Sequence, residues 1–265
     1  MKCGGKRGQP LSARTVGHAH RVLHRALQRA VESEVLARNV SAVISPPKVE
    51  EEEIEILTAD QISHVKDKLV GHSLYDINVL DLATGMRRGE LLALRLSDVD
   101  LDLATVRIER SLEETKSGLR FKPPKTKHGK RTISLPPSAV AVLREHRRKL
   151  FETRMALGLG KPDRDTLLFG ELDGSPKRPD QLSWLWRSAC KSLKLPMVSF
   201  HALRHTHASA LIAAGLDVVV ISRRLGHGSP HVTLRVYGHL FKRDDSAAAR
   251  AIEAAMRTRN EPSGS

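Results

Sequence analysis

An abrupt change in composition near residue 46 constrains how this chain can fold. Pro46 and Pro47 cannot continue a helix, and an acidic run at residues 50–53 follows shortly after them. Prolines followed by a block of like charges are typical of an extended linker, with a solvated loop inside one domain as the alternative. The linker interpretation predicts four consecutive parts: a helical N-terminal part (1–44), an acidic linker (45–57), a globular domain (58–242) and a C-terminal helix with a tail (243–265).

The N-terminal part is expected to contain one long helix. Residues 1–49 carry nine Lys or Arg residues and two acidic residues, so the surface of this helix is basic. Ser12 is placed to cap the helix and Asn39 to end it. The apolar residues at helical spacing between them are Val16, Leu23, Leu27, Val31 and Val35. One helix cannot bury its own apolar stripe, so this part must pack against something else.

The globular domain is predicted to be mostly α-helical with a small antiparallel β-sheet. Thr58 and Gln61 have the spacing of a capping box at a helix start. Alternating apolar residues predict a strand over 99–110 and a returning strand over 131–135, with a basic turn over 116–130 between them. Apolar residues at helical spacing predict helices at 76–83, 88–96, 138–157, 181–191 (with Trp184 and Leu185 buried) and throughout the last third.

Charge and composition narrow the class of partner. Lys and Arg number 44 against 30 Asp and Glu, a net charge of +14 that favours nucleic acid first and an anionic membrane second. Aromatic residues make up 3%, too few for a single-strand binding surface of stacked rings. Two cysteines exclude a disulfide framework and a four-thiolate zinc site. With no long apolar stretch and a polar N-terminus, we expect a cytoplasmic protein without membrane contact.

The last third of the chain gathers the residues best suited to chemistry. His201 and Arg204 are three residues apart on a predicted helix, so they share a face. His227 follows Gly226, which ends another predicted helix. Tyr237, one of two tyrosines, lies in a polar setting that packing does not explain. A phenol is a poor nucleophile unless a base or cations favour the phenolate, and a cluster of His and Arg can do this.

Two further basic motifs suit a phosphate ligand. Residues 84–90 place Arg87 and Arg88 at the start of a predicted helix, where the helix dipole adds positive potential. Residues 116–131 hold seven basic residues and no acidic one between two strands, which suits a hairpin that follows DNA phosphates. A solvated surface loop is the alternative in both cases. The candidate DNA contacts are Arg88, Lys122, Lys127, Lys130 and Arg131.

Taken together, residues 55–242 resemble the phage-integrase family of tyrosine recombinases. Five motifs in the family's order carry the resemblance: Thr84-Gly-Met-Arg-Arg-Gly-Glu90, Pro124-Lys-Thr-Lys127, His201-Ala-Leu-Arg-His-Thr206, Leu225-Gly-His227 and Val236-Tyr-Gly-His239. Residues 11–39 also resemble the C-terminal helical part of the family's core-binding domain. Since fewer than 50 residues precede the linker, we expect a shortened, partial core-binding domain.

The resemblance implies a site-specific recombinase that cuts and rejoins DNA strands through a 3′-phosphotyrosyl intermediate. Tyr237 matches the nucleophile of the family, and Arg87 and Arg204 match the arginines that hold the phosphate. Cations held ready at the developing negative charge stabilise such a transition state more than the ground state. The sequence shows no carboxylate cluster, so no divalent metal is implied. No ATP is implied, because the phosphotyrosine preserves the bond energy, and no other cofactor is expected.

Four more residues match catalytic positions of the family. Lys125 matches the general acid that protonates the leaving 5′-oxygen, and Lys127 is the alternative. His201 matches the residue that accepts the tyrosine proton or orients the phosphate. His227 matches the residue that hydrogen-bonds the scissile phosphate.

The expected partners are double-stranded DNA attachment sites and other copies of this chain. The family recombines two duplexes with four protomers, so a homotetramer on DNA is implied. An apolar face on a predicted helix at 245–257 favours exchange of that helix between protomers, with docking on its own domain as the alternative. Three other interpretations remain: a non-catalytic DNA-binding protein with a helix-turn-helix at 210–237, a topoisomerase-like enzyme, and a truncated inactive integrase.

Overall fold

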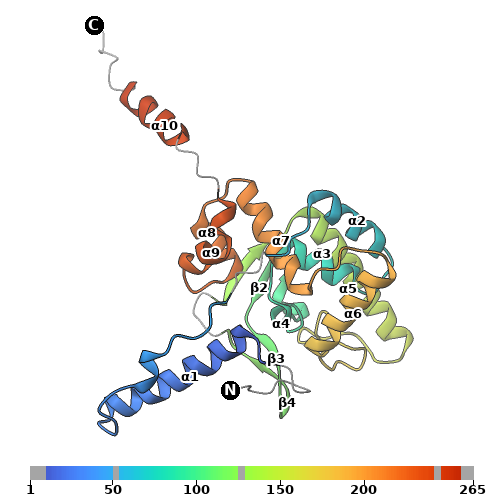
Figure 1. The fold of residues 1–265 in the computed structure, drawn as a ribbon. Coiled ribbons are helices and arrows are strands. Elements are labelled where there is room, and N and C mark those ends of the chain that lie inside the picture. Colours follow the sequence, from blue (N-terminus) through green and yellow to red (C-terminus); the bar gives the residue numbers. More distant parts are fainter. Residues whose placement is uncertain (1–9, 50–53, 125–128, 242–245, 258–265) are drawn as a thin grey trace. The chain divides into compact units, whose positions relative to one another are not determined.

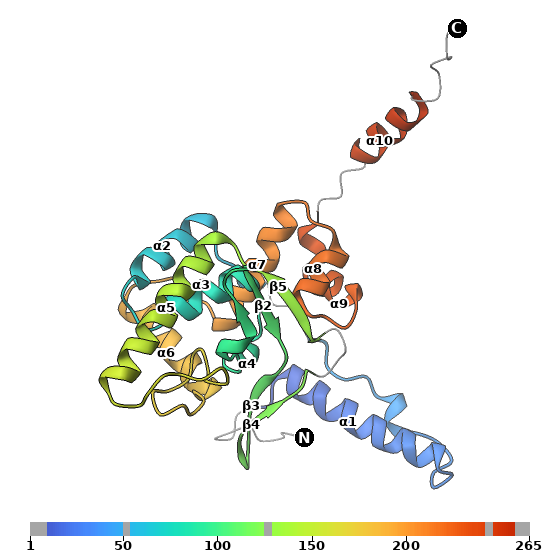
Figure 2. The same ribbon diagram turned by 180° about the vertical axis from the view of Figure 1, so that it is seen from behind.

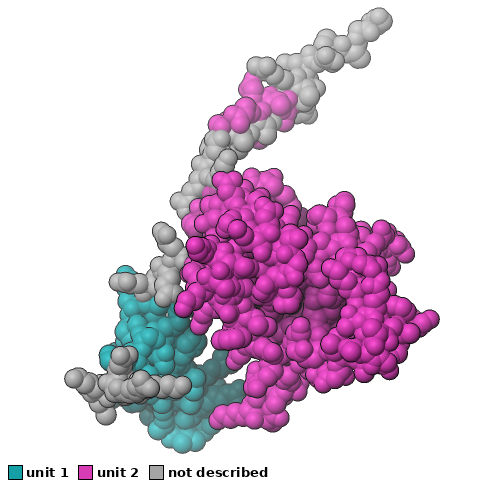
Figure 3. Space-filling model, turned by 90° about the vertical axis from the view of Figure 1, so that its right-hand side faces the viewer, with its two compact units in different colours: residues 1–53 teal, residues 54–265 magenta. Residues whose placement is uncertain are grey.

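The chain divides into two compact units, Met1–Glu53 and Ile54–Ser265 (Figure 3). A computed structural model describes residues 10–49, 54–124, 129–241 and 246–257 (Figure 1). The boundary between the units falls inside the segment at residues 45–57. Helices dominate, and the strands form small antiparallel sheets, so the predicted fold class is confirmed.

The described part of the first unit consists of one long α-helix and a short 3₁₀ helix that follows it. Helix α1 (Ala13–Glu32) begins at Ser12, whose hydroxyl accepts from the backbone N of Thr15 at 3.2 Å, as the sequence predicts. The helix ends seven residues earlier than predicted (32 instead of 39), because Glu34 adopts φ 59°, which a helix cannot continue. Asn39 instead caps the 3₁₀ helix η2 (Val40–Val43) and donates back to the carbonyl of His24 at 3.0 Å.

The second unit opens with two helices that start and stop where local signals predict. Helix α2 (Ala59–Leu69) begins with the expected capping box between Thr58 and Gln61. Helix α3 (Tyr75–Thr84) ends at Gly85, which adopts the left-handed conformation with φ 61°.

The next predicted helix is much shorter than expected. Helix α4 covers Arg88–Leu91, and a 3₁₀ turn, η3, follows at Leu96–Asp98. The backbone N of Leu96 donates to the carbonyl of Thr166 at 3.0 Å, so the chain leaves the helix to pair with a distant segment. The prediction of a helix over 88–96 was therefore wrong beyond its first turn.

Three short strands form the main sheet in the order β1–β2–β5; Figure 2 labels β2 and β5. They are β1 (Val99–Asp100), β2 (Thr105–Ile108) and β5 (Arg131–Ser134), and all pairs are antiparallel. Val106 lies opposite Ile133, and both side chains are buried. The strand predicted over 99–110 is thus interrupted, while the returning strand is confirmed.

A separate hairpin occupies part of the predicted basic turn. Strands β3 (Ser111–Thr115) and β4 (Gly118–Lys122) pair in antiparallel register and are joined by residues 116–117. Gly118, the first residue of β4, has φ 112°, a backbone conformation that favours glycine. The prediction of a turn over 116–130 missed this hairpin because its strands alternate weakly in polarity.

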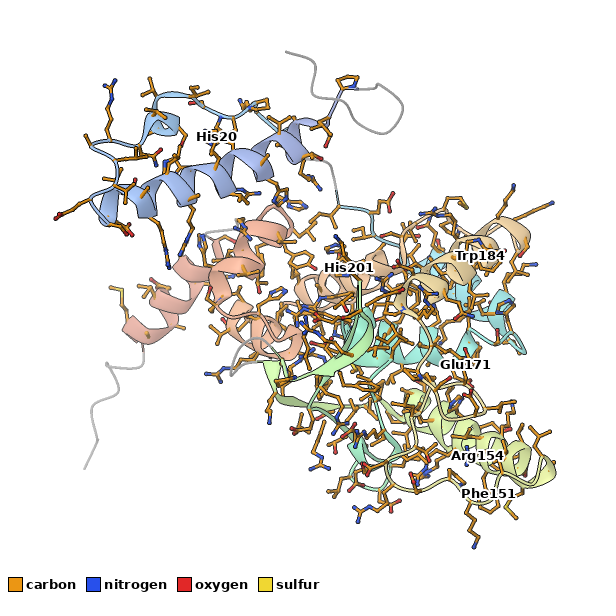
Figure 4. All side chains as sticks on the ribbon, turned by 90° about the horizontal axis from the view of Figure 1, so that it is seen from below. His20, Phe151, Arg154, Glu171, Trp184 and His201 are labelled. Carbon is orange, nitrogen blue, oxygen red and sulfur yellow. The ribbon has the colours of Figure 1, made fainter. Side chains whose placement is uncertain are left out.

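Two long helices cover the core of the second unit. They are α5 (Pro137–Ala156) and α6 (Pro179–Ser192), close to the predicted ranges 138–157 and 181–191. On α6, Trp186 is 1% exposed and its Nε1 donates to the carbonyl of Val198 at 2.8 Å, whereas Trp184 is 65% exposed (Figure 4). The prediction that Trp184 is buried was wrong, since the buried face of α6 runs through Leu182 and Trp186, four residues apart.

Helices α7 (Phe200–Ala213), α8 (Val218–Leu225) and α9 (Pro230–Tyr237) form a second, smaller core. The 3₁₀ turn η5 (Gly238–Leu240) and helix α10 (Ser246–Arg257) come after them in the chain. The buried members of this core come from α7, α8 and α9: Ala208, Ile212, Ile221, Leu225 and Tyr237. Among the described residues, no helix combines the length and apolar character needed to cross a membrane.

One acidic side chain lies in the interior beside α7. Asp81 on α3 is 1% exposed, and its Oδ1 has no hydrogen-bond partner among the described residues. Burial raises the pKa of this carboxyl well above its usual range, against the lowering effect of Arg204 nearby. The folded protein therefore holds a proton at Asp81 that the unfolded chain releases near pH 4.

Replacing Asp81 with Asn should flatten the pH dependence of stability. A raised pKa in the folded state makes wild-type stability fall as the pH rises from about 4 towards the folded-state pKa. Asp81→Asn keeps the shape and removes the titration, so its melting temperature relative to wild type should increase between pH 5 and pH 8. The exposed Asp67→Asn on α2 is the matched control and should show no such trend; parallel curves for wild type and Asp81→Asn would contradict this account.

Candidate active site

The corner between α3 and α4 sets the position of the first predicted arginine. Gly85 turns the chain, and an added Cβ there would lie 2.5 Å from Cδ2 of His207. Arg87 follows as the N-cap of α4, and its side chain remains 43% exposed. Its Nη2 donates to the carbonyl of Gly226 at 3.0 Å, which connects α4 to the end of α8.

A buried carboxylate orients Arg87. Glu90 is 3% exposed and accepts from Nη1 of Arg87 at 2.8 Å and from its backbone N at 2.9 Å. The same carboxylate accepts from Arg131 at 2.8 and 3.2 Å. Burial acts to raise the pKa of Glu90, but Arg131 and then Arg87 outweigh it and lower that pKa below its usual range. Glu90 is therefore ionised and serves two arginines.

Arg204 lies in the interior of α7. It is 3% exposed, and it donates from Nη1 to the carbonyl of Gly85 at 2.6 Å and from Nη2 to that of Leu225 at 2.8 Å. Burial, followed by the charge of Arg87, lowers the pKa of Arg204 to about 10. The guanidinium is still charged at neutral pH, and it joins the ends of α3 and α8.

Tyr237 ends α9 with its hydroxyl directed at α7. The residue is 1% exposed, and its hydroxyl lies 2.7 Å from Nδ1 of His205. Burial raises the pKa of Tyr237 to about 12, although the charge of Arg204 acts to lower it. The phenol thus lies within electrostatic reach of Arg204 and away from solvent.

The two predicted histidines lie around this cluster. His201 reaches the surface at the start of α7 (Figure 4), and its ring meets that of His205 edge to face, with centroids 4.7 Å apart. His227 follows α8, and its Nδ1 lies 2.8 Å from Oγ1 of Thr233. Lost hydration, and then nearby positive groups, lower the pKa of His201 to about 4 and that of His227 to about 3. Both rings are therefore neutral at neutral pH.

Three of the predicted DNA contacts form ion pairs with acidic side chains of the second unit. Arg88 pairs with Asp180 and Ser183 at the start of α6. Lys122 forms an ion pair with Glu113 across the hairpin. Nζ of Lys130 lies 3.3 Å from Oε2 of Glu109.

Arg131 differs most from its predicted surface role. Its side chain is 7% exposed, and it donates to Glu90 and to the carbonyls of Gly129 and Arg224. We therefore interpret it as a support for Glu90. Lys125 and Lys127 lie outside the described residues.

Three site residues were missed by the sequence prediction. Glu90 lies inside the motif at 84–90, and the available sequence signal was an acidic residue shortly after two arginines. His205 lies inside the motif at 201–206, but no local pattern identifies its partner. Arg224 donates to Nε2 of His207 at 3.1 Å and to the carbonyl of Ala83 at 2.9 Å, contacts that only the fold creates. Among the described residues, no group of three or more His, Cys, Asp or Glu side chains could hold a metal ion.

Comparison with known proteins identifies the family. The phage integrase family model matches residues 49–244. A XerC-like tyrosine recombinase from Caldanaerobacter subterraneus subsp. tengcongensis is 28% identical and covers 92% of this chain and 67% of its own length. The ICEBs1 integrase of Bacillus subtilis is 29% identical over 87% of this chain and 63% of its own length. The chain thus spans about two thirds of the length of these relatives.

Solved structures show the same fold. The Tn1549 transposon integrase in complex with a circular intermediate DNA has a TM-score of 0.71 at 21% identity and covers 93% of this chain and 80% of its own. A lambda integrase tetramer bound to a Holliday junction has a TM-score of 0.54 at 21% identity. The match covers 82% of this chain and 57% of the lambda integrase chain. The fold and the matched residues define a tyrosine-recombinase type of domain. The chain belongs to the phage integrase family.

Removing Glu90 should unfold this corner of the protein. Glu90→Ala leaves the buried Arg131 without its counter-ion, and breaking a buried pair from one side costs about 3–5 kcal/mol. Urea denaturation should show that loss.

The matched control for Glu90 is an acidic residue in an exposed pair. Glu152→Ala removes one of the two acidic partners of Arg148 on the surface of α5, and the loss of such an exposed contact should leave the free energy of unfolding nearly unchanged. Equal losses in the two variants would show that Glu90 is not the support described here.

Proposed function

We propose that this protein is a site-specific DNA recombinase that cuts and rejoins strands through a phosphodiester linkage to Tyr237. The observation that carries the proposal is the buried Tyr237 hydroxyl, which contacts α7 at His205 beside Arg204. A buried phenol with a polar partner and a neighbouring guanidinium has the parts that attack on phosphorus requires. In the proposed reaction the phenol oxygen bonds to phosphorus and the 5′-oxygen leaves, giving a 3′-phosphotyrosyl linkage.

Two arginines would hold the phosphate during attack. Arg87 keeps a partly exposed guanidinium at the corner before α4, fixed from behind by Glu90. Arg204 keeps its charge in the interior, where a cation acts more strongly than in water. As negative charge grows on the non-bridging oxygens, these two cations stabilise the transition state, and losing one such donor costs about 10²–10³ in rate.

The remaining family positions complete the proposal. His201 and His227 are neutral and can donate hydrogen bonds to the scissile phosphate without adding charge. Lys125, or Lys127 in its place, would protonate the leaving 5′-oxygen.

DNA binding would be shared by the two units. The basic helix α1, in a core-binding segment over residues 1–44, would contact phosphates, as would Arg88, Lys122, Lys127 and Lys130 on the catalytic domain over 58–242. The present acidic partners of Arg88, Lys122 and Lys130 would be exchanged for phosphate. A protein that acts on chromosomal attachment sites would work in the cytoplasm, bound to the nucleoid.

Replacing Tyr237 with Phe should abolish covalent attachment to DNA. The substitution removes one oxygen and keeps the packing of the ring in the small core. Incubation with a supercoiled plasmid followed by a denaturing gel should give a protein–DNA adduct and relaxed plasmid with wild type and neither with Tyr237→Phe, while DNA affinity is unchanged.

The other tyrosine of the chain provides the control. Tyr75→Phe on α3 is a matched substitution against the main core and should keep full cleavage. Cleavage by Tyr237→Phe would exclude the proposed nucleophile, and relaxation without recombinant products would favour the topoisomerase-like alternative.

We further propose that four copies assemble on two duplexes and exchange α10. On this helix Ile252 is 63% exposed and Met256 is 68% exposed, four residues apart and so on one face. An apolar face of this kind suits docking on a neighbouring copy. The tetrameric lambda integrase complex supports the stoichiometry.

Adding a charge to this face should separate assembly from cleavage. Ile252→Asp should abolish two-duplex complexes on native gels and recombinant products, while the covalent adduct on single duplexes remains. Ile252→Leu preserves the apolar surface and should assemble normally. Normal assembly by Ile252→Asp would exclude α10 as the exchanged element.

A further inference from the structure

The hydroxyl of Tyr237 has a basic partner that no sequence motif assigned. Nδ1 of His205 lies 2.7 Å from this hydroxyl, and the two rings meet edge to face with centroids 5.6 Å apart. His205 lies on α7 next to Arg204, so the helix that carries the buried cation also carries this imidazole. The ring of His201 also contacts the ring of His205, with centroids 4.7 Å apart.

The direction of this hydrogen bond follows from the two protonation states. Burial, and then the charge of Arg204, lowers the pKa of His205, so the ring is neutral at neutral pH. Burial keeps the phenol protonated, with a pKa of about 12. A neutral imidazole with its proton on Nε2 offers the Nδ1 lone pair as acceptor, and the phenol O–H donates to it.

Such a phenol needs a base in order to attack. With a pKa of about 12, only about one molecule in 10⁵ carries a phenolate at pH 7. A phenolate formed in advance is therefore too rare to carry the reaction efficiently. A base placed on the proton can remove it as the oxygen–phosphorus bond forms.

We propose that His205 is the general base that accepts the Tyr237 proton during strand cleavage. The assignment rests on the proposed function and refines it. His205 touches the reacting oxygen directly, whereas His201 contacts the ring of His205 and is left free to hydrogen-bond the phosphate.

The proton and electron pairs balance in each direction. As Tyr237 Oη bonds to phosphorus, its O–H bond breaks and the proton passes to Nδ1 of His205, which becomes an imidazolium. The bond from phosphorus to the 5′-oxygen breaks, and that oxygen takes a proton from a lysine or from water. In resealing, a 5′-hydroxyl attacks phosphorus and gives its proton to the same lysine or to water. The bond from phosphorus to the tyrosine oxygen breaks, and His205 returns its proton to that oxygen.

The test compares His205→Gln with His205→Ala on supercoiled plasmid. Glutamine can accept the phenol hydrogen bond but cannot carry the proton away, so both variants should form the covalent adduct at least about 100-fold more slowly than wild type, the range for loss of a general base. Resealing should slow as well, because the same proton must return. DNA affinity and melting temperature of His205→Gln should match wild type.

The matched control is His64→Ala, an exposed histidine on α2 that should cleave at the wild-type rate. His205→Gln at the wild-type rate would overturn the proposal, because a hydrogen bond alone would then suffice. If His205→Ala fails to fold, the near-isosteric His205→Gln decides the question. A wild-type protein that forms no adduct contradicts the proposed function itself, whereas adduct formation unaffected by the loss of His205 contradicts only the role given to this histidine.

Discussion

The buried guanidinium of Arg204 is the contact on which the site depends. Gly85 closes α3 and Leu225 ends α8, and both carbonyls accept from this one side chain on α7. Carbonyl oxygens at a helix C-terminus lack partners within their helix and carry the negative end of its dipole. A cation in the interior is tolerated when its donors are satisfied in this way. The arginine thus fixes the turn before Arg87 and the turn before His227 with the same group.

Much of the fold could be predicted because its signals are local. The start of α1 at Ser12, the capping box at Thr58 and the end of α3 at Gly85 depend on residues within one helical turn. The predictions that were wrong depend on contacts between residues far apart in the sequence. Helix α4 stops early because Leu96 bonds to Thr166, and the choice of Trp186 over Trp184 depends on which face of α6 meets the core. No window of neighbouring residues contains that information.

The candidate site also has one part that local sequence predicts and another that only the fold creates. Short sequence motifs pointed to candidate site residues such as Arg87 and Tyr237, because each motif is local and the motifs follow a fixed order along the chain. Their partners come from far away: Arg131 is 41 residues from Glu90, and Tyr237 is 32 residues from His205. Arg131 shows the limit most clearly, because a basic residue at the end of a basic segment is indistinguishable in sequence from a DNA contact. Only its burial against Glu90 identifies it as a support.

The shared carboxylate of Glu90 links two parts of the molecule energetically. Arg131 begins β5, and Arg87 is the N-cap of α4, so strand and helix depend on one counter-ion. Neighbouring groups in one such network give non-additive effects when both are changed. An exchange of Arg131 for Lys preserves the charge but replaces a forked guanidinium by a single ammonium. A replacement of Arg131 that preserves charge would therefore change the support of Glu90 and, through Glu90, the position of Arg87, so it would not be neutral.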